Sequence, residues 1–399
     1  MTRNFLKIFQ ILQILLKAKF YLKKPKKNKI IIFDHKGANT PYYKYFINSD
    51  CSILNVRGED INLYVIFSLI LKFKKISLKE YIIQYLNFVR PQFIFHNSFN
   101  IRFFEIEKNE FTFKFIKIFT QSELKNHHDY QEFLQNKKNL SCDYLFVWSE
   151  GMKQLMKKNI LGKYIINGSF FNNEGPEIDL NKLESKLVYV SQYRTFKKRE
   201  SRETKNTIRD EFHGLKFSWE QYMEPDLDVA IALKDFCMEH DIKFEIAGTS
   251  INDKIEEKKF FSEKLGEDGW TYLESSIERR GIYLTSNAKY IVTVDSTLGY
   301  ECLARGQRVC FFSIRSKYLK SDYAKFGWPL HLSEEGKCWT TNNSKEDFKR
   351  LMNFLVFEDD IAWKKILDTE LRDLVFYNLN NSMYKKFLKT NNLINDATN

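Results

Sequence analysis

Three small polar residues lie where a predicted strand is followed by a predicted helix. The strand VTV ends at Asp295, Ser296 and Thr297, and the residues that follow have a helical pattern. Free backbone N–H groups at a helix N-terminus, together with the positive end of the helix dipole, attract phosphate. The two hydroxyl groups would add donors for anionic oxygens. These residue types favour a phosphate-binding turn, and the alternative is simple N-capping, for which Ser, Thr and Asp are all suited.

Glu301, one turn into the same helix, bears on the choice between ligand binding and capping. A capping box places its Glu three residues after the cap, which is Gly299 counted from Ser296 and Tyr300 counted from Thr297. Glu301 matches neither position, so its carboxylate is available to a neutral donor such as a ribose hydroxyl. Gly299 would permit the close approach of a ligand. The spacing places ligand binding slightly ahead of capping.

Two successive alternations of strands and helices surround these residues. Apolar runs typical of strands buried in a parallel sheet occupy, in the first half, 29–34, 51–56, 92–97, 114–120, 143–149 and 163–168. In the second half they occupy 187–194, 242–250, 270–275, 290–294 and 308–312. Helices are expected at 61–73, 77–89, 226–241, 276–288, 298–305 and 374–388. The pattern predicts an α/β fold with two doubly wound parallel-sheet, Rossmann-like domains.

A polar stretch that contains Gly and Pro separates the two alternations and is the expected linker. We therefore divide the chain into a basic amphipathic helix and linker, a first Rossmann-like domain, a second Rossmann-like domain and a C-terminal helical tail. Their expected bounds are 1–27, 28–175, 176–375 and 376–399.

The formal net charge of +12 is concentrated at the N-terminus. Arg3 and eight lysines precede Asp34 without a single acid, so the rest of the chain is nearly balanced and nucleic-acid binding is disfavoured. A helix over 4–17 would be amphipathic and too often interrupted by polar residues to span a bilayer. It fits peripheral attachment to an anionic membrane surface, and the alternative is a helix docked on its own domain.

Two further features bear on where the protein works. The helix expected at 61–73 is apolar over about 11 residues, which favours a buried helix over a membrane span. The six cysteines are scattered, with no CxxC pair, which indicates reduced thiols rather than disulfides or a zinc site. We expect a cytoplasmic protein at the inner face of the plasma membrane.

The chain resembles a GT-B glycosyltransferase, with two Rossmann-like halves and the motif DSTLGYECLARGQRVCFFS in the second. More narrowly, it is similar to bacterial surface-carbohydrate (O-antigen and lipopolysaccharide) biosynthesis proteins. IINGSFFNNE before the linker and LVYVSQYR after it carry this likeness, which covers nearly the whole chain. The resemblance implies two domains facing a cleft, a nucleotide-sugar donor, a glycan or lipid-linked acceptor, and no cofactor.

The same resemblance suggests roles on the donor side. Ser296 and Thr297 correspond to diphosphate ligands, in a turn with Asp295 and Gly299, and Glu301 corresponds to the ribose ligand. These assignments match what the residue types alone favour.

Three further donor-side residues are candidates. Arg194 could neutralise the leaving diphosphate, because GT-B enzymes usually lack a catalytic metal; the alternative is an ordinary surface arginine. Tyr272 and Ser275 end another strand, near the place where this fold class usually seats the nucleotide base.

A glycosyl acceptor hydroxyl also needs a base in the first domain. Asp34 and His35 follow the first strand, and His96 ends another, so these three are the candidates. His127 and His128 have no matched ligand spacing, and no metal site is expected.

Rival functions share this fold, because fold does not determine chemistry. One rival is a polyol-phosphate transferase or a nucleotide-sugar epimerase. Another is a non-catalytic protein that binds nucleotide sugar or glycan in a membrane assembly complex. The leading hypothesis is transfer of a sugar from a nucleotide donor to a growing surface glycan.

Overall fold

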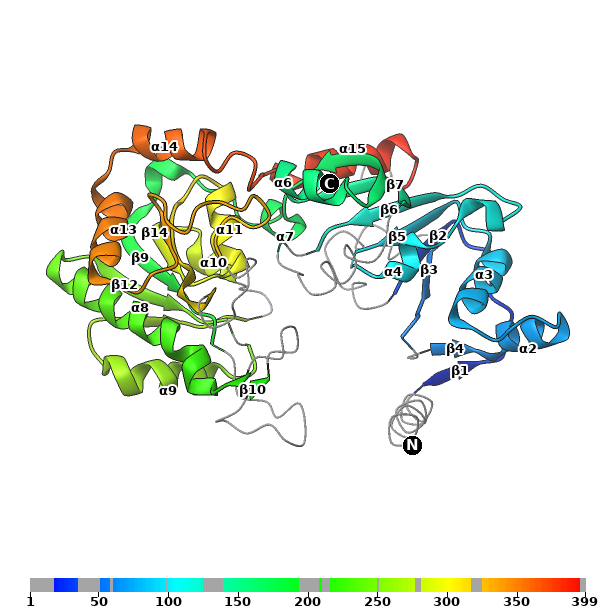
Figure 1. Cartoon of the computed structure of the whole chain (residues 1–399), viewed down its shortest axis with the longest axis horizontal. Helices are drawn as coiled ribbons and strands as arrows, with labels where there is room; N and C mark the ends of the chain where they lie inside the picture. The colour runs from blue at the N-terminus through cyan, green and yellow to red at the C-terminus, as the bar shows by residue number, and fades with distance from the viewer. Residues whose placement is uncertain are drawn as a thin grey trace.

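The computed structural model consists of two α/β domains, each built on a six-stranded parallel sheet (Figure 1). It describes residues 18–34, 51–57, 60–97, 99–122, 124, 139–193, 208–209, 216–249, 251–276, 281–316 and 325–394. The helix expected at 4–17 lies outside these ranges, as do His35 and Arg194. The predicted α/β class with two parallel-sheet domains is confirmed.

The first sheet has the strand order β3-β2-β5-β6-β7-β8, with every neighbouring pair parallel. Its strands are β2 (Ile30–Phe33), β3 (Cys51–Leu54), β5 (Phe93–His96), β6 (Ile116–Thr120), β7 (Leu140–Val147) and β8 (Ile160–Ile166). All six overlap the predicted apolar runs. The strand order reverses between β2 and β5, and ligands of open α/β sheets bind outside the carboxyl ends of strands at such a point.

Short helices connect the strands of the first domain. They are α2 (Leu63–Leu71), α3 (Leu78–Val89), α4 (Ile101–Phe104), α6 (Glu150–Met156) and α7 (Phe170–Asn173). A small parallel pair, β1 (Lys19–Tyr21) with β4 (Asp60–Asn62), was not predicted. Among the described helices, none combines the length and apolarity needed to cross a membrane.

The second sheet has the order β13-β12-β9-β14-β15-β16 and is also wholly parallel. Its strands are β9 (Glu184–Val190), β12 (Lys243–Ala247), β13 (Thr271–Leu273), β14 (Ala288–Thr293), β15 (Arg308–Phe312) and β16 (Trp339–Thr340). Only β16 was missed by the sequence. Here the order reverses between β9 and β14, which places the DST turn at the switch point.

The helices of the second domain are α8 (Trp219–Glu239), α9 (Lys254–Leu265), α10 (Gly281–Thr285), α11 (Thr297–Ala304), α13 (Lys345–Phe357) and α14 (Asp360–Asp368). The prediction that α8 begins at Asp226 was wrong. A capping box between Ser218 and Gln221 starts the helix earlier, and Pro225 lies inside it. Asp226 is therefore a buried residue of the helix interior.

The C-terminal tail returns to the first domain. Its helix α15 (Ser382–Thr390) packs Tyr384 and Phe387 against Phe146 of β7. The helix predicted over 374–388 starts later than expected, because Asn380 and Asn381 adopt left-handed conformations that interrupt it.

Hydrogen bonds between buried amide side chains hold the C-terminal tail where it passes back to the first domain. Asn381 Oδ1 accepts hydrogen bonds from Asn167 Nδ2 at 3.0 Å and from Asn173 Nδ2 at 2.8 Å. Asn378 Nδ2 donates to Asn167 Oδ1 at 2.9 Å. The IINGSFFNNE segment thus binds the chain's own C-terminal tail.

Candidate functional site

The carboxyl ends of β9, β14 and β15 are joined by one buried network centred on Arg315. The Arg315 side chain, just after β15, is 1% exposed and forms ion pairs with Asp226 and Asp295. The distance from its Nη1 to Asp295 Oδ1 is 2.8 Å. Gln192 Oε1, after β9, accepts from Arg315 Nη1 at 3.0 Å and from Asp295 N at 3.1 Å. The network fixes the two loops that flank the switch point.

The electrostatics keep Arg315 charged. Burial lowers the pKa of its guanidinium. The carboxylates of Asp295 and Asp226 raise this pKa by more than burial lowers it, so the net pKa lies above the usual value. Tyr189 Oη donates to Asp226 Oδ1 at 2.8 Å, and the ring of Tyr222 lies 4.4 Å from the guanidinium carbon. Asp295, which was expected at the ligand-facing edge, turns its carboxylate to Arg315 in this arrangement.

Ser296 is the N-cap of α11. Its Oγ accepts a hydrogen bond from Leu298 N at 3.3 Å, so capping is confirmed for this residue. A hydroxyl that accepts keeps its own O–H donor, which leaves the predicted phosphate contact compatible with the cap. Thr297 is the first residue of α11 and partly exposed. The phosphate roles of both residues stay predictions.

Gly299 has a packing role that the sequence did not reveal. A Cβ built at this position would lie 2.7 Å from Thr293 Cγ2 and 2.8 Å from a ring carbon of Phe311. The glycine therefore lets α11 approach β14 and β15 closely. The close approach expected of a ligand is made here by the protein's own sheet.

Glu301 lies at the contact between the two domains. Its Oε1 accepts from Ser169 Oγ of the first domain at 2.5 Å, and its backbone oxygen accepts from Asn172 Nδ2 at 2.9 Å. Burial raises the pKa of Glu301 to about 7, while the Ser169 hydrogen bond and the charge of Arg305 oppose this shift. Glu301, the predicted ribose ligand, therefore has a pKa near neutral pH, and one oxygen of its carboxyl group already accepts a hydrogen bond from Ser169.

Tyr272 and Ser275, the residues predicted near the nucleotide base, both have partners within the domain. Tyr272 Oη donates to Glu257 Oε2 at 3.0 Å, and the Ser275 hydroxyl donates to the carbonyl of Gly248. Burial, followed by the charge of Glu257, raises the pKa of Tyr272. The first bond joins β13 to α9, and the second joins the loops after β12 and β13. A contact of either residue with the base stays a prediction.

Asp34 lies directly after β2, at the switch point of the first sheet. Its side chain is 1% exposed, and its backbone adopts a left-handed conformation with φ 72°. Oδ2 accepts from Arg57 Nε at 2.7 Å and from Asn100 Nδ2 at 3.4 Å. Oδ1 is buried and has no hydrogen-bond partner in the part of the chain that the structure describes.

Such an arrangement costs free energy and therefore needs a reason. A buried acceptor without a partner is unfavourable, and backbone strain of this kind gathers at functional sites. One oxygen of Asp34 is held by a cation, and the other has no partner among the described residues, so it can accept a proton as a general base must. His35, the neighbouring candidate, stays a prediction.

His96, the third candidate base, is fully buried. Its Nδ1 lies 2.7 Å from the carbonyl oxygen of Phe33, and its Nε2 accepts from Asn100 N at 3.3 Å. The carbonyl requires the proton on Nδ1, so both ring nitrogens are used inside the protein. This geometry argues against His96 as a base and gives it a structural role next to Asp34.

Sequence reasoning missed Arg315, Asp226 and Arg57. Arg315 had a signal, because it follows the buried strand RVCFF just as Asp295 follows its own strand. Asp226 entered the sequence analysis only as the first residue of the helix expected at 226–241. Arg57 follows the strand paired with β2, and a search of every strand end would have included it. In the described residues, no group of three or more His, Cys, Asp or Glu could hold a metal.

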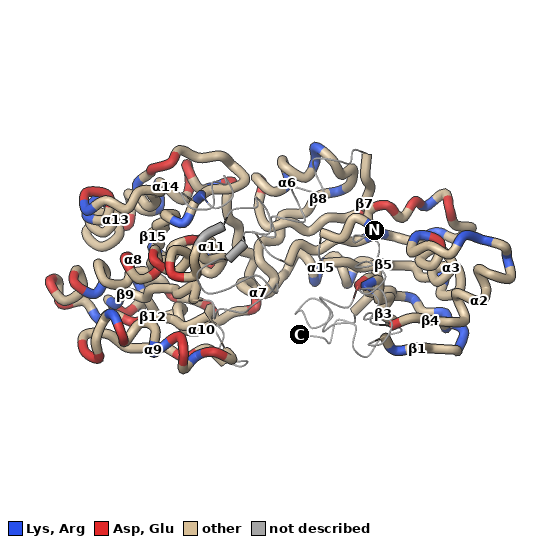
Figure 2. Tube along the Cα trace, turned by 60° about the horizontal axis from the view of Figure 1, so that its bottom comes forward, with Lys and Arg blue, Asp and Glu red and all other residues tan. Residues whose placement is uncertain are grey.

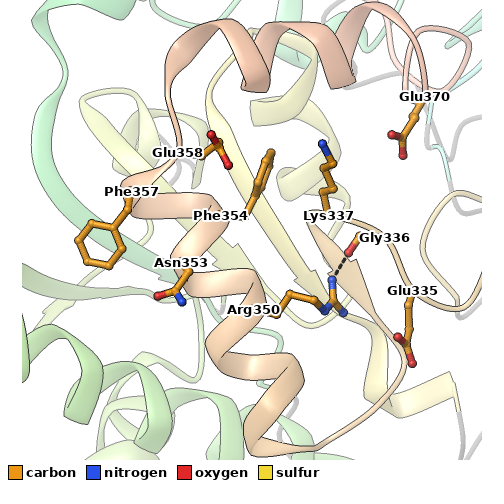
Figure 3. Close-up of a pocket in the computed structure, with 9 residues that line it drawn as sticks. All are labelled: Glu335, Gly336, Lys337, Arg350, Asn353, Phe354, Phe357, Glu358 and Glu370. Atoms are coloured by element: carbon orange, nitrogen blue, oxygen red, sulfur yellow. Dashed lines mark hydrogen bonds between the residues drawn. The ribbon is translucent and has the colours of Figure 1, made fainter.

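A groove of about 720 Å³ lies elsewhere, along α13 (Figure 3). Its lining includes the acids Glu335, Glu358 and Glu370, with Arg350 donating to the carbonyl of Gly336. None of the residues predicted for donor or acceptor binding lines it. The groove is therefore distinct from both switch points.

The model of a family described as "putative O-antigen biosynthesis protein" matches residues 115–392. No curated protein sequence matches the chain.

Among solved structures, UDP-GlcNAc 2-epimerase from Neisseria meningitidis, bound to UDP-GlcNAc, is 13% identical with a TM-score of 0.48, covering 90% of this chain and 98% of that one. The wall teichoic acid polymerase TagF is 11% identical with a TM-score of 0.47, covering 92% and 90%. An epimerase from Listeria monocytogenes is 10% identical with a TM-score of 0.48, covering 91% and 95%.

Proposed function

The chain belongs to this family of O-antigen biosynthesis proteins, and we propose that it is a glycosyltransferase. It would move a sugar from a nucleotide-sugar donor to a surface polysaccharide or lipopolysaccharide acceptor. The observation that carries the proposal is the buried carboxylate oxygen of Asp34, at the switch point of the first domain, that has no hydrogen-bond partner among the described residues. A donor site is proposed at the switch point of the second.

In the proposed reaction, Asp34 Oδ1 accepts the proton of the acceptor hydroxyl. The acceptor oxygen forms a bond to the anomeric carbon of the sugar, and the bond from that carbon to the donor diphosphate breaks. The nucleoside diphosphate leaves with the bonding electron pair. Arg57 holds the other oxygen of Asp34, so the carboxylate keeps its orientation through the transfer.

The start of α11 supports the donor half of this proposal. Its N-terminus supplies the positive end of the helix dipole at the strand order reversal, and the Arg315 network fixes the loop before it. Ser296 and Thr297 would bind the diphosphate and Glu301 the ribose. Arg194 would neutralise the leaving group in place of a metal.

The test begins with donor identity. Nucleotide sugars are screened for thermal stabilisation of the full chain, since a ligand of the folded state raises its stability. A stabilising donor is then incubated with lipid-linked glycan acceptors, and transfer of labelled sugar is measured. Conversion of the donor sugar without any acceptor would favour an epimerase, and donor binding without any turnover would favour a binding protein. Either outcome would contradict the proposal.

We also propose a cytoplasmic location at the inner face of the plasma membrane, with residues 1–27 as an attachment segment. The charge of this segment supports it, because lysines near an anionic surface contribute about 1 kcal/mol each. A chain lacking 1–17, which keeps β1, should stay folded and bind anionic vesicles more weakly, most clearly at low salt. Equal binding before and after the deletion would contradict this attachment.

A further inference from the structure

One face of α2 exposes apolar side chains that the first domain does not cover. Tyr64, Phe67 and Leu71, spaced three and four residues apart, are 38%, 53% and 79% exposed. Residues at this spacing share one side of a helix, while Val65 and Leu69 on the other side are buried in the domain. The sequence predicted a buried helix here, and only half of α2 fits that prediction.

The turn after α2 extends the same apolar surface. Phe73 is 98% exposed and Ile76 is 60% exposed. Phe73 also has a left-handed backbone, with φ 54°, which is unfavourable for a bulky residue. An aromatic side chain held in a strained conformation and presented to solvent indicates a partner outside the domain.

Positive charge borders these apolar side chains. Lys72 precedes Phe73 and Lys75 follows it by two residues, and both are exposed, whereas Lys74 between them pairs with Glu80. From Ile61 to Lys79 the chain has no acid, and β1 with its basic surroundings packs beside α2. Figure 2 shows lysine and arginine segments gathered around β1 and α2.

We propose that this surface, formed by Tyr64, Phe67, Leu71, Phe73 and Ile76 with Lys72 and Lys75, binds an anionic lipid bilayer at its interface. Apolar side chains would enter the boundary between headgroups and acyl chains, and the lysines would meet anionic headgroups. The surface belongs to α2 and the turn after it, beside β1, and residues 1–17 are no part of it. It rests on the proposed membrane location but uses no step of the proposed reaction.

A second copy of the chain fits this surface less well. A symmetric contact would bring Lys72 and Lys75 of both copies into one interface to which residues 61–79 contribute no acid, and like charges at a contact repel. A bilayer with anionic headgroups satisfies the apolar and the charged side chains together. Charge complementarity therefore selects the membrane.

The test measures sedimentation of the full chain with phosphatidylcholine vesicles, with and without phosphatidylglycerol. The double variant Leu71→Ser/Phe73→Ser should lower binding to anionic vesicles by about 10-fold or more at low and high salt. The matched control, Ile255→Ser/Ile361→Ser, changes two residues of the second domain that are 79% and 80% exposed, and should bind as wild type. Lys72→Gln/Lys75→Gln should weaken binding only to anionic vesicles and mainly at low salt.

Other outcomes would overturn the inference. Wild-type vesicle binding by the Leu71→Ser/Phe73→Ser variant would exclude the surface. A lower molar mass of that variant by light scattering without lipid, with vesicle binding unchanged, would assign the surface to self-association instead. Sugar transfer is not measured, so failure of the proposed reaction cannot be mistaken for failure of this surface. Loss of binding only after deletion of 1–17, which leaves β1 beside α2 in place, would assign attachment to that segment alone.

Discussion

The two switch points of the molecule both carry an ion pair between an arginine and a buried aspartate, but they differ in how completely the charged atoms are paired. In the second domain, Arg315 is enclosed by Asp226, Asp295 and Gln192, and its charge is balanced by two carboxylates. In the first domain, Asp34 has one cation, and its second oxygen is buried without a partner in the described part of the chain. One site is a closed network and the other is an open one.

The difference indicates that the Arg315 network stabilises the loops of the second domain, whereas Asp34 is suited to proton transfer. A closed ion cluster resists movement and stays charged, so it can hold the loops around a donor without taking part in proton transfer. A carboxylate oxygen that has no hydrogen-bond partner among the described residues can still accept from a substrate hydroxyl that reaches it. We therefore expect the largest stability effects at Arg315 and the largest effects on turnover at Asp34.

The largest expected effect is on stability. Arg315→Met should lower the free energy of unfolding by about 3–5 kcal/mol, because it leaves the buried carboxylate of Asp226 and the mostly buried carboxylate of Asp295 without their cation. Denaturant unfolding monitored by circular dichroism measures it. Arg308→Met is the matched control, since Arg308 is also buried but pairs with Asp360, which is 86% exposed and remains hydrated. An equal loss of unfolding free energy in both variants would show that the Arg315 network stabilises the fold no more than an ion pair with an exposed partner does.

The next effect is on turnover. Asp34→Asn should lower the transfer rate by about 100-fold or more with donor affinity unchanged, because an amide cannot accept the proton. Asn tolerates the left-handed backbone, so the fold should persist. Steady-state kinetics and donor titration measure the two quantities.

The control for Asp34 is Asp143→Asn. Asp143 is another carboxylate of the first domain with an ion pair, to Lys108 at 2.6 Å, and it should be dispensable for transfer. If Asp34→Asn transfers sugar at the wild-type rate, the base lies elsewhere and His35 is the next residue to change.

The two sites also differ in how far the sequence could predict them. A buried strand is visible in the sequence as a short continuous apolar run. The sequence therefore predicts β2, β9, β14 and the turn Asp295–Thr297 correctly. The partner of Asp295 was not, because Arg315 is 20 residues away and meets it only when β14 and β15 pair. Likewise, nothing near Gly299 in the sequence shows that Phe311 lies against it. Contacts between residues that come together only when two strands pair cannot be predicted from the sequence around either residue alone.

The third effect concerns pH at the contact between the domains. The folded pKa of Glu301 is raised to about 7, so this carboxyl group is neutral at pH 6 and charged at pH 8.5. Charged carboxylates make the stronger hydrogen bonds to hydroxyls. Glu301→Gln should therefore weaken nucleotide-sugar binding by about 10-fold, or 1.4 kcal/mol, at pH 8.5, and much less at pH 6. Calorimetric titration at both pH values measures the difference.

Stability gives the control for that titration. A carboxyl group whose folded pKa lies above its unfolded value contributes stability that is complete below the unfolded pKa and is lost as pH rises through the folded pKa. Wild type should lose stability between about pH 4.5 and 7, and Glu301→Gln should lose less. A 2′-deoxynucleotide donor should be nearly indifferent to the substitution if the ribose contact is real. Equal binding of the intact donor to both proteins at pH 8.5 would exclude that contact.

The smallest expected effect separates capping from ligand binding at the start of α11. Ser296→Ala removes the bond to Leu298 N and should cost about 1 kcal/mol of stability, whereas Thr297→Ala removes no cap and should cost less. If both hydroxyls bind the diphosphate, both variants should also weaken donor binding, with Thr297→Ala doing so at nearly unchanged stability. Thermal unfolding and donor titration of the same samples measure the two quantities. Loss of stability in Ser296→Ala with wild-type donor affinity in both variants would leave capping as the whole role of this turn, and the donor phosphates would then have to be bound outside it.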